Sequence, residues 1–191
     1  IIVAETERLT RLVNQVLDMA KIEAGQVDWR LAPIDVRDLL YSAAATTQPL
    51  FKDRGARLQI EVQEGLPQLH ADPDRLLQVL LNLLSNAAKF VPAGTGEVGV
   101  RVYGDAQGLT VCVQDNGPGV PVGHEQLIFE RFHQAGLPTP GGQGTGLGLP
   151  ISRHILAHFG GRIWLEPTEG PGACFCFRLP WEPAPSEETG P

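Results

Sequence analysis

Four polar side chains recur at intervals of four, four and three residues within an otherwise apolar stretch: Gln78, Asn82, Asn86 and Lys89. In a helix this spacing places them on one face. Polar groups on a buried helix cost free energy unless something hydrogen-bonds them. Asparagine oxygens suit a hard cation such as Mg²⁺, and a lysine suits phosphate. The stripe therefore predicts either a metal and phosphate site or simply the solvent-facing side of the helix.

A second candidate is the carboxylate of Asp115, which ends an alternating apolar stretch. Leu109, Val111 and Val113 precede it with a period of two, so a strand turns Asp115 toward their face. A carboxylate at the end of a core face needs a donor, and the exocyclic amine of adenine is one. In the turn that follows, residues 116–119, glycines let the backbone approach a planar ring. By itself this segment is equally compatible with an ordinary turn.

The third candidate is the glycine-rich run at 141–149, in which Gly144, Gly146 and Gly148 alternate before a helix. Glycines allow a backbone to wrap phosphates, and a helix N-terminus supplies N–H groups and positive potential. The run is not a P-loop, because no lysine follows its glycines. It is not the dinucleotide-binding fingerprint either, because no strand leads directly into it.

The elements that must position these residues follow from hydrophobic periodicity. Helices are predicted at 1–24, 35–54, 72–90, 124–134 and 146–158, and strands at 27–31, 57–62, 98–102, 109–113, 162–166 and 173–179. Asp35 and Asp72 are predicted helix caps, and Pro73 suits a first helical position. We therefore predict an α+β fold: a two-layer sandwich with helices on one face of a mixed sheet, preceded by one long amphipathic helix.

Composition narrows the class of protein. The 191 residues carry a formal net charge of −7, which argues against a nonspecific nucleic-acid binder. We expect a cytoplasmic fragment of a longer protein, with no membrane contact of its own, because no apolar run suits a bilayer and the chain begins at Ile1 inside a helical pattern. The parent is free to carry a membrane anchor. Cys112, Cys174 and Cys176 lack zinc-type spacing, and we expect them to pack rather than to bind metal or form a disulfide.

Taken together, these motifs resemble the ATP-binding domain of bacterial sensor histidine kinases, in the superfamily that includes gyrase, Hsp90 and MutL. The resemblance runs from Val27 to Pro180, and its four motifs are an N box at 82–90, glycine boxes at 115–119 and 144–149, and an F box at 128–132. Residues 1–26 resemble the second helix of the dimerisation and phosphotransfer domain. The resemblance implies a Bergerat-type catalytic domain over 27–180. Residues 181–191 are rich in Pro and Glu, and we expect a disordered tail there.

The resemblance also implies roles for individual residues. Asn82 and Asn86 are expected to bind Mg²⁺, and Asn82, Lys89 and Gln143 to act at the metal and phosphates. The expected ATP contacts are Asn86, Phe90, Asp115, Gly117, Gly119, Gly144, Thr145, Gly146, Leu147 and Gly148. Phe129 and Phe132 are expected to anchor a lid over 133–143.

The implied reaction is transfer of the ATP γ-phosphoryl group to a histidine. None of the five histidines lies in the family's acceptor context, so we expect the acceptor on a phosphotransfer helix of a homodimeric parent. A response-regulator receiver domain is the expected further partner. Two alternatives are a degenerate nucleotide-binding signalling module and an ATPase of the same superfamily. Those ATPases usually carry a glutamate where Asn82 stands, which favours the kinase. Gln78 stands where kinases often have a glutamate, which puts a general base there in doubt.

Overall fold

The computed structural model describes residues 2–134 and 145–183. In chain order the elements are α1 (Ile2–Glu23), β1 (Ala32–Ile34), α2 (Val36–Arg54), β2 (Arg57–Val62), β3 (Leu69–Ala71), α3 (Pro73–Phe90), β4 (Glu97–Asp105), β5 (Gly108–Asp115), the 3-10 helix η1 (Leu127–Phe129), α4 (Gly148–His158), β6 (Arg162–Glu166) and β7 (Cys174–Leu179).

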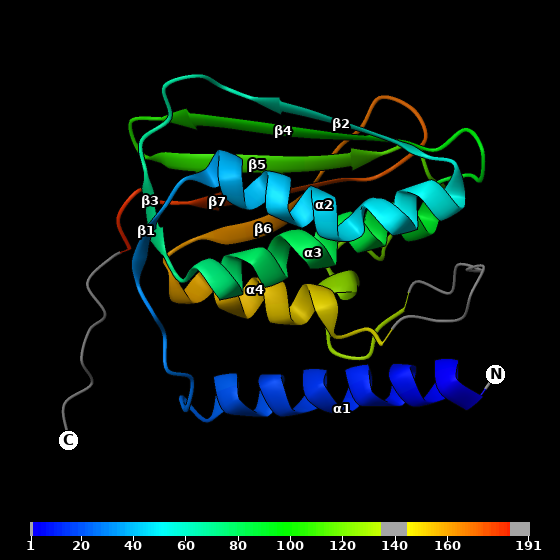
Figure 1. The fold of residues 1–191 in the computed structure, drawn as a ribbon, viewed down its shortest axis with the longest axis horizontal. Coiled ribbons are helices and arrows are strands. Elements are labelled where there is room, and N and C mark those ends of the chain that lie inside the picture. The colour runs from blue at the N-terminus through cyan, green and yellow to red at the C-terminus, as the bar shows by residue number, and fades with distance from the viewer. Residues whose placement is uncertain (1, 135–144, 184–191) are drawn as a thin grey trace.

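A five-stranded sheet in the order β2-β4-β5-β7-β6 forms one layer of the fold. β2 runs parallel to β4 and the other neighbours are antiparallel, so the sheet is mixed as predicted. Helices α2, α3 and α4 lie side by side along one face of this sheet (Figure 1). β1 and β3 form a separate two-stranded sheet. The predicted two-layer α+β architecture is confirmed.

The core lies between the sheet and these three helices. Strand residues alternate in burial because successive side chains point to opposite faces. On the inner face, toward the helices, Val98, Val100, Val111, Val113 and Phe177 are buried. α3 contributes its apolar side, which includes Leu80 and Leu84, to the same cluster. The inner face is therefore an ordinary apolar core, and Asp115 lies at the end of one of its rows.

Both predicted helix caps are present. The Asp35 carboxylate accepts from the amides of Arg37 and Asp38 at the start of α2. The Asp72 carboxylate accepts from two backbone amides in the first turn of α3, and its Oδ2 also accepts from the Arg30 amide at 2.9 Å. A cap carboxylate satisfies amides that a helix leaves without intrahelical partners. These caps set the start of α3 and hence the positions of the polar residues along it.

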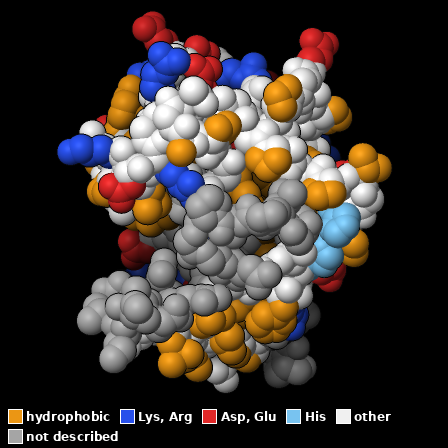
Figure 2. Space-filling view, turned by 90° about the vertical axis from the view of Figure 1, so that its right-hand side faces the viewer, with side chains coloured by type: hydrophobic (Ala, Val, Ile, Leu, Met, Phe, Trp, Pro, Cys, Tyr) orange, Lys and Arg blue, Asp and Glu red, His pale blue; other side chains and the backbone are white. Residues whose placement is uncertain are grey.

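Helix α1 packs on the outer side of the helical layer through polar groups. Asp18 pairs with Arg75 of α3 at 2.7 Å and accepts from Gln78 Nε2 at 2.7 Å. Met19 is buried beside them. The apolar stripe of α1 points away from the domain, and its exposed members are Leu9, Val13, Val16 and Leu17. Figure 2 shows hydrophobic side chains gathered at the bottom of the molecule, where α1 lies.

Three local predictions were wrong. Residues 27–31 form no strand, and β1 follows at Ala32–Ile34 instead. Trp29 within this segment stacks on His158 with ring centroids 3.9 Å apart, so a tertiary contact rather than strand pairing holds it. The helix expected at 124–134 is reduced to the single turn of η1. Cys112 and Cys176 are joined by a disulfide, although we expected all three cysteines only to pack.

Trp181, which the sequence assigned to the tail, packs into the domain. Its Nε1 donates to the Asp105 carbonyl at 2.8 Å, and its own carbonyl accepts from the His70 amide at 3.0 Å. Within residues 2–134 and 145–183, no helix is both long and apolar enough to cross a membrane.

Candidate nucleotide-binding site

Asn82 on α3 connects that helix to the start of α4. Its Nδ2 lies 3.2 Å from the Gly148 carbonyl and 3.2 Å from Ser152 Oγ. Since Ser152 Oγ donates its own proton to the Gly148 carbonyl, it accepts from Asn82. The Asn82 amide group is thus occupied, and its carbonyl oxygen Oδ1 is the atom left to act as a ligand.

The rest of the polar stripe divides into two parts. Asn86, Lys89 and Phe90 continue along α3 as half-buried residues, and the Lys89 ammonium lies 5.3 Å from the centre of the Phe90 ring. Gln78 instead bonds Asp18 and accepts from Arg75 at 3.0 Å. The side-chain amide of Gln78 is therefore part of the contact with α1. Helical spacing placed it in the stripe but could not tell which partner it meets.

Asp115 is nearly buried at the end of β5, with 7% of its surface exposed. Its Oδ1 accepts from the Gly117 amide at 2.8 Å and the Ala173 amide at 3.3 Å. Burial raises the pKa of this carboxyl group, and the two amide hydrogen bonds oppose that shift. A buried, oriented carboxylate whose Oδ1 is held by backbone amides has Oδ2 to offer to a ligand donor.

The turn after Asp115 is held close to its surroundings. Asn116 Oδ1 accepts from the Glu97 amide at 2.8 Å, so this side chain faces the start of β4. A side-chain carbon on Gly117 would lie 2.8 Å from the Phe90 carbonyl oxygen. One on Gly119, whose φ is +77°, would lie 2.8 Å from the Gly172 carbonyl oxygen. Glycine is therefore required here by space, and the turn lies directly against the end of α3.

The second glycine segment is described from Thr145 onward, and Gln143 and Gly144 lie outside the described residues. Gly146 has a φ of +69°, and its carbonyl accepts from the Phe132 amide at 3.0 Å. Leu147 is buried, and its amide lies 3.3 Å from Thr145 Oγ1. α4 begins at Gly148, where Asn82 meets it. The described part of the loop thus joins the N-terminus of α4 to α3.

The two phenylalanines expected to anchor a lid differ. Phe129 is buried, and its ring lies edge-on to Phe175 with centroids 6.4 Å apart. Phe132 is 62% exposed and has a positive φ of 58°, so its side chain lies largely at the surface of the domain, and its role at the lid stays a prediction. Its backbone amide donates to the Gly146 carbonyl, which ties this segment to the start of α4. Most of the predicted lid falls at 135–144, outside the described residues.

Sequence reasoning missed three residues that complete this arrangement: Ser152, Gly172 and Ala173. Ser152 orients Asn82, Ala173 holds Asp115, and Gly172 lies against the Asp115 carbonyl where any larger side chain would collide. Gly172 stands in the glycine-rich segment before β7, which was the one available signal. The pairing of β7 with β5 brings Ala173 to Asp115 across 58 residues, and no local pattern reports it.

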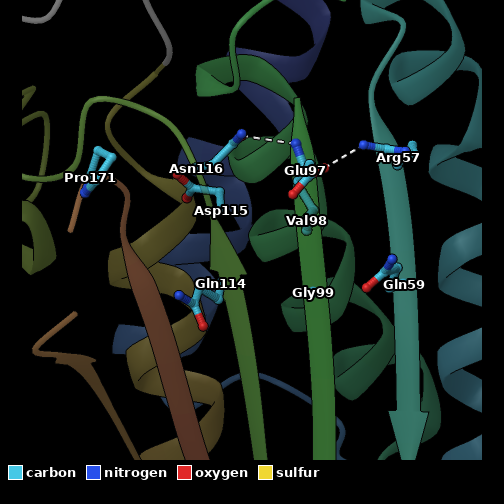
Figure 3. Close-up of a pocket in the computed structure, with 9 residues that line it drawn as sticks. All are labelled: Arg57, Gln59, Glu97, Val98, Gly99, Gln114, Asp115, Asn116 and Pro171. Carbon is cyan, nitrogen blue, oxygen red and sulfur yellow. Dashed lines mark hydrogen bonds and ion pairs between the residues drawn. The ribbon is translucent and has the colours of Figure 1, made fainter. Parts of the chain in front are cut away.

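A concave region of about 200 Å³, open to solvent, lies on the outer face of the sheet beside Asp115. It is lined by Arg57, Gln59, Glu97, Val98, Gly99, Gln114, Asp115, Asn116 and Pro171, and the helices lie behind the strands in that view (Figure 3). Of the predicted site residues that the structure describes, Asp115 alone lines it. The remaining candidate residues lie on the helix side of the sheet: Asn82 meets the start of α4, and Gly117 lies against the end of α3.

Known proteins resemble this chain over most of its length. The family model described as "Histidine kinase-, DNA gyrase B-, and HSP90-like ATPase" matches residues 71–183. The chain is 36% identical over 179 residues to the sensor protein KdpD of Escherichia coli (strain K12), covering 94% of this chain and 20% of that protein. It is 33% identical over 196 residues to the circadian input-output histidine kinase CikA of Synechococcus elongatus, covering 97% of this chain and 26% of CikA. The chain thus spans about a quarter or less of these relatives.

Solved structures give the same grouping. Full-length ShkA in complex with AMPPNP superposes with a TM-score of 0.81 and 34% identity, over 92% of this chain and 36% of ShkA. A nucleotide-free catalytic domain of histidine kinase ThkA gives a TM-score of 0.70 and 26% identity, over 81% of this chain and 97% of the ThkA domain. ThkA in complex with the response regulator protein TrrA gives a TM-score of 0.74 and 24% identity, over 95% of this chain and 50% of the ThkA chain. At this identity the match shows a likeness of fold.

Proposed function

Since the chain belongs to the histidine kinase-, DNA gyrase B- and HSP90-like ATPase family, as the ATP-binding catalytic domain of a sensor histidine kinase, we propose that it uses Mg²⁺-ATP to phosphorylate a histidine outside these 191 residues. The nucleotide lies between α3, the turn after Asp115 and the loop that opens α4. The single observation that carries this proposal is the buried Asp115 carboxylate at the end of the inner face.

Adenine recognition is assigned to Asp115. Its Oδ1 is held by the amides of Gly117 and Ala173, which fixes the direction of Oδ2. We assign the planar base to the neighbourhood of Gly117 and Gly119, since glycines let a backbone approach a ring closely. The exocyclic amine of adenine donates to Oδ2, and a hydrogen bond to a charged group in a buried site contributes about 1.5–3 kcal/mol.

The metal is assigned to Asn86 and Asn82. The residues fit a hard cation, because two side-chain amides lie one turn apart on α3 and the Nδ2 contacts of Asn82 leave Oδ1 to face the ion. Bound Mg²⁺ would neutralise charge on the β- and γ-phosphates. Lys89 and Gln143 are assigned to the phosphates. Backbone amides of Thr145, Gly146, Leu147 and Gly148 at the α4 N-terminus complete that end of the site, together with Gly144.

The protein's part in phosphoryl transfer is positioning and charge stabilisation. The acceptor is an imidazole nitrogen on a phosphotransfer helix of the parent, which acts as a homodimer. This chain alone therefore binds ATP without phosphorylating itself. Residues 1–26 are assigned to that phosphotransfer domain and 27–180 to the catalytic domain. A response regulator is the next phosphate acceptor, which the complex of the similarly folded ThkA with TrrA supports.

The test is a calorimetric titration of the chain with ATP and Mg²⁺, comparing wild type with Asp115→Asn. Loss of the adenine contact predicts a fall in affinity of about 10- to 100-fold. Asp38→Asn is the matched control, since it makes the same chemical change at an exposed position in the first turn of α2. Equal affinities for Asp115→Asn and wild type contradict the adenine assignment.

A second measurement tests the kinase assignment. The chain is incubated with Mg²⁺-ATP and a separately produced phosphotransfer domain of its parent, and acid-labile phosphate on that domain is measured. We expect phosphate on the added domain and none on the chain alone. Rapid ATP hydrolysis without phosphohistidine would favour the ATPase alternative, and tight ATP binding with neither product would favour a degenerate signalling module.

A further inference from the structure

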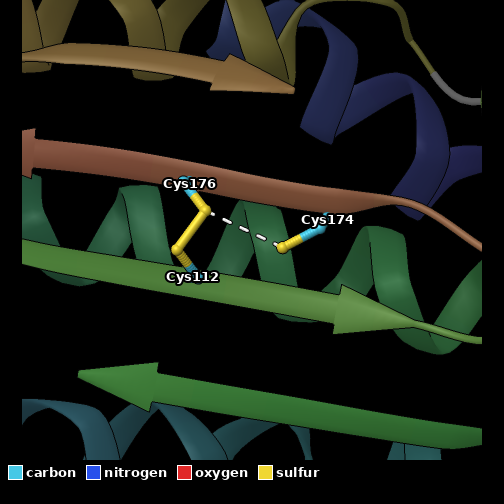
Figure 4. Close-up of side chains that lie close together, drawn as sticks. All are labelled: Cys112, Cys174 and Cys176. Atoms are coloured by element: carbon cyan, nitrogen blue, oxygen red, sulfur yellow. Dashed lines mark hydrogen bonds between the residues drawn. A yellow bond between two sulfur atoms is a disulfide. The ribbon is translucent and has the colours of Figure 1, made fainter. Parts of the chain in front are cut away.

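Three sulfur atoms gather on the outer face of the sheet, away from the helices. Cys112 of β5 is the register partner of Cys176 of β7, and Cys174 is two residues before Cys176 on the same face. The three residues are 5%, 3% and 1% exposed in the order Cys112, Cys174, Cys176. All three sulfurs lie within 4.8 Å of one another (Figure 4).

The cluster contains one disulfide and one thiol. Cys112 and Cys176 are bonded across the strand pair, with Cα atoms 4.1 Å apart, and the Cys174 thiol lies 3.7 Å from the Cys176 sulfur. A dithiol reductant converts this disulfide to two thiols by giving up two electrons and two protons, and is itself oxidised to a disulfide. Reduction therefore creates three adjacent thiols on two strands that backbone hydrogen bonds also hold together.

The spacing of the sulfurs suits one metal ion. Thiolate sulfur binds metals such as Zn²⁺ at about 2.3 Å, which puts three sulfurs around one ion about 4 Å apart. The Cys174 and Cys176 sulfurs are 3.7 Å apart, and those of Cys112 and Cys174 lie within 4.8 Å. The third pair, Cys112 and Cys176, is bonded here, and its sulfurs must separate on reduction before both can bind one ion. Because the ligands come from paired β-strands, their backbone is already in place before an ion arrives.

The number and type of ligands select the ion. Among residues 2–134 and 145–183, no fourth histidine, cysteine or carboxylate joins this cluster. Structural zinc sites in proteins are four-coordinate, whereas soft thiolate ligands also select Cu(I). Three buried sulfurs with no fourth protein ligand therefore suit a soft ion that accepts three-fold coordination.

The surroundings supply charge and cover. Burial raises the pKa of the Cys174 thiol, and the nearby Arg101 guanidinium opposes this shift. A bound cation and Arg101 would both offset thiolate charge. Trp164 packs against the three cysteines, which excludes water and places a fluorophore beside the sulfurs.

We propose that Cys112, Cys174 and Cys176 of the reduced protein bind one Cu(I) ion, and that the Cys112–Cys176 disulfide is the oxidised, metal-free form of this site. Binding releases the thiol protons to solvent as the three sulfur–metal bonds form. The site is separate from the nucleotide site because the sulfurs face away from the helices, although Cys174 directly follows Ala173, which holds Asp115.

The test is an anaerobic titration of the reduced, metal-free chain with Cu(I) in competition with a chromophoric Cu(I) chelator. We expect one equivalent to bind, with quenching of Trp164 fluorescence. Cys174→Ser should weaken binding by about 100-fold or more, since losing a ligand costs more than the 10- to 100-fold lost on changing a residue that only orients a ligand. The same variant keeps Cys112 and Cys176, so mass spectrometry should still find their disulfide after oxidation.

Thr110→Ala is the control, because Thr110 is buried on the same outer face of β5 and carries no sulfur. It should bind Cu(I) as wild type does. Far-UV circular dichroism of each reduced protein establishes that the chain stays folded. The proposal is overturned if the chelator removes all Cu(I) from reduced wild type, if Cys174→Ser binds equally well, if Zn²⁺ binds more tightly than Cu(I), or if the disulfide is reduced only when the chain unfolds.

Discussion

The two faces of the central sheet carry different chemistry although they share the same strands. On β7, Phe177 points inward to the helices and is fully buried, while the next residue, Arg178, points outward and pairs with Asp105. The two aspartates of the β4–β5 hairpin differ in the same way. Burial raises the pKa of Asp115 on the inner face, and the Arg178 hydrogen bond lowers that of Asp105 on the outer face.

The difference shows how each face is stabilised. A helical layer removes the inner face from water, so a polar group is retained there only with fixed partners, and Asp115 has them in two backbone amides. Within the part of the chain that the structure describes, no helix covers the outer face, and three of its buried residues, the cysteines, pack together with Trp164. The inner face therefore suits an organic ligand with matching donors, and the outer face suits an ion small enough to lie among sulfurs.

The largest effect that would test this contrast is on the inner face. Phe177→Ala removes a fully buried ring and should lower the free energy of unfolding by about 3–5 kcal/mol, through lost burial and the cavity left behind. Urea unfolding followed by circular dichroism measures it. A loss below 1 kcal/mol would mean that the inner face is not the main core.

The disulfide provides the matching test on the outer face. Its reduction should lower the free energy of unfolding by about 2–4 kcal/mol, because the bond closes a long loop between residues 64 apart in sequence. The measurement is urea unfolding with and without a dithiol, in metal-free buffer. The Cys174→Ser variant keeps the bonded pair, so the dithiol should lower its free energy of unfolding by the same amount. The Cys112→Ser variant cannot form the disulfide, so the dithiol should not change its stability.

A smaller effect concerns the inner carboxylate. Because burial raises the pKa of Asp115 above its unfolded value, the folded state binds the proton more tightly. The stability that Asp115 contributes is therefore fully present below the unfolded pKa and is lost as pH rises through the folded pKa. Wild type should lose stability relative to Asp115→Asn over that window. Urea unfolding of both proteins across acidic to neutral pH measures the difference, and a constant difference would contradict the raised pKa.

The smallest effect is expected from Arg178→Ala on the outer face. Exposed ion pairs contribute little to stability, so the free energy of unfolding should change by an amount close to the error of extrapolation. The pKa of Asp105 is lowered, so its contribution to stability depends on pH in the opposite sense to that of Asp115. The contribution of Asp105 is present above its unfolded pKa and is lost as pH falls through its folded pKa. A loss as large as that of Phe177→Ala would remove the contrast between the faces.

Much of the fold could be predicted from local sequence. The Asp35 and Asp72 caps and the strand at 57–62 match the structure, because capping and period-two alternation depend on residues close together in the chain. The segment around Trp29 was predicted wrongly as a strand, since its stacking on His158 depends on a residue more than a hundred positions away.

The sequence by itself determined the type of each site residue and the face on which it lies: the row that ends in Asp115, the stripe on α3, and Cys174 with Cys176 on one side of β7. Tertiary structure alone decided their partners. It directed Gln78 to Asp18 rather than to a ligand, brought Ala173 to Asp115, and set Cys176 against Cys112. The physical reason is that periodicity follows from backbone geometry within one element, whereas pairing depends on which distant elements pack together.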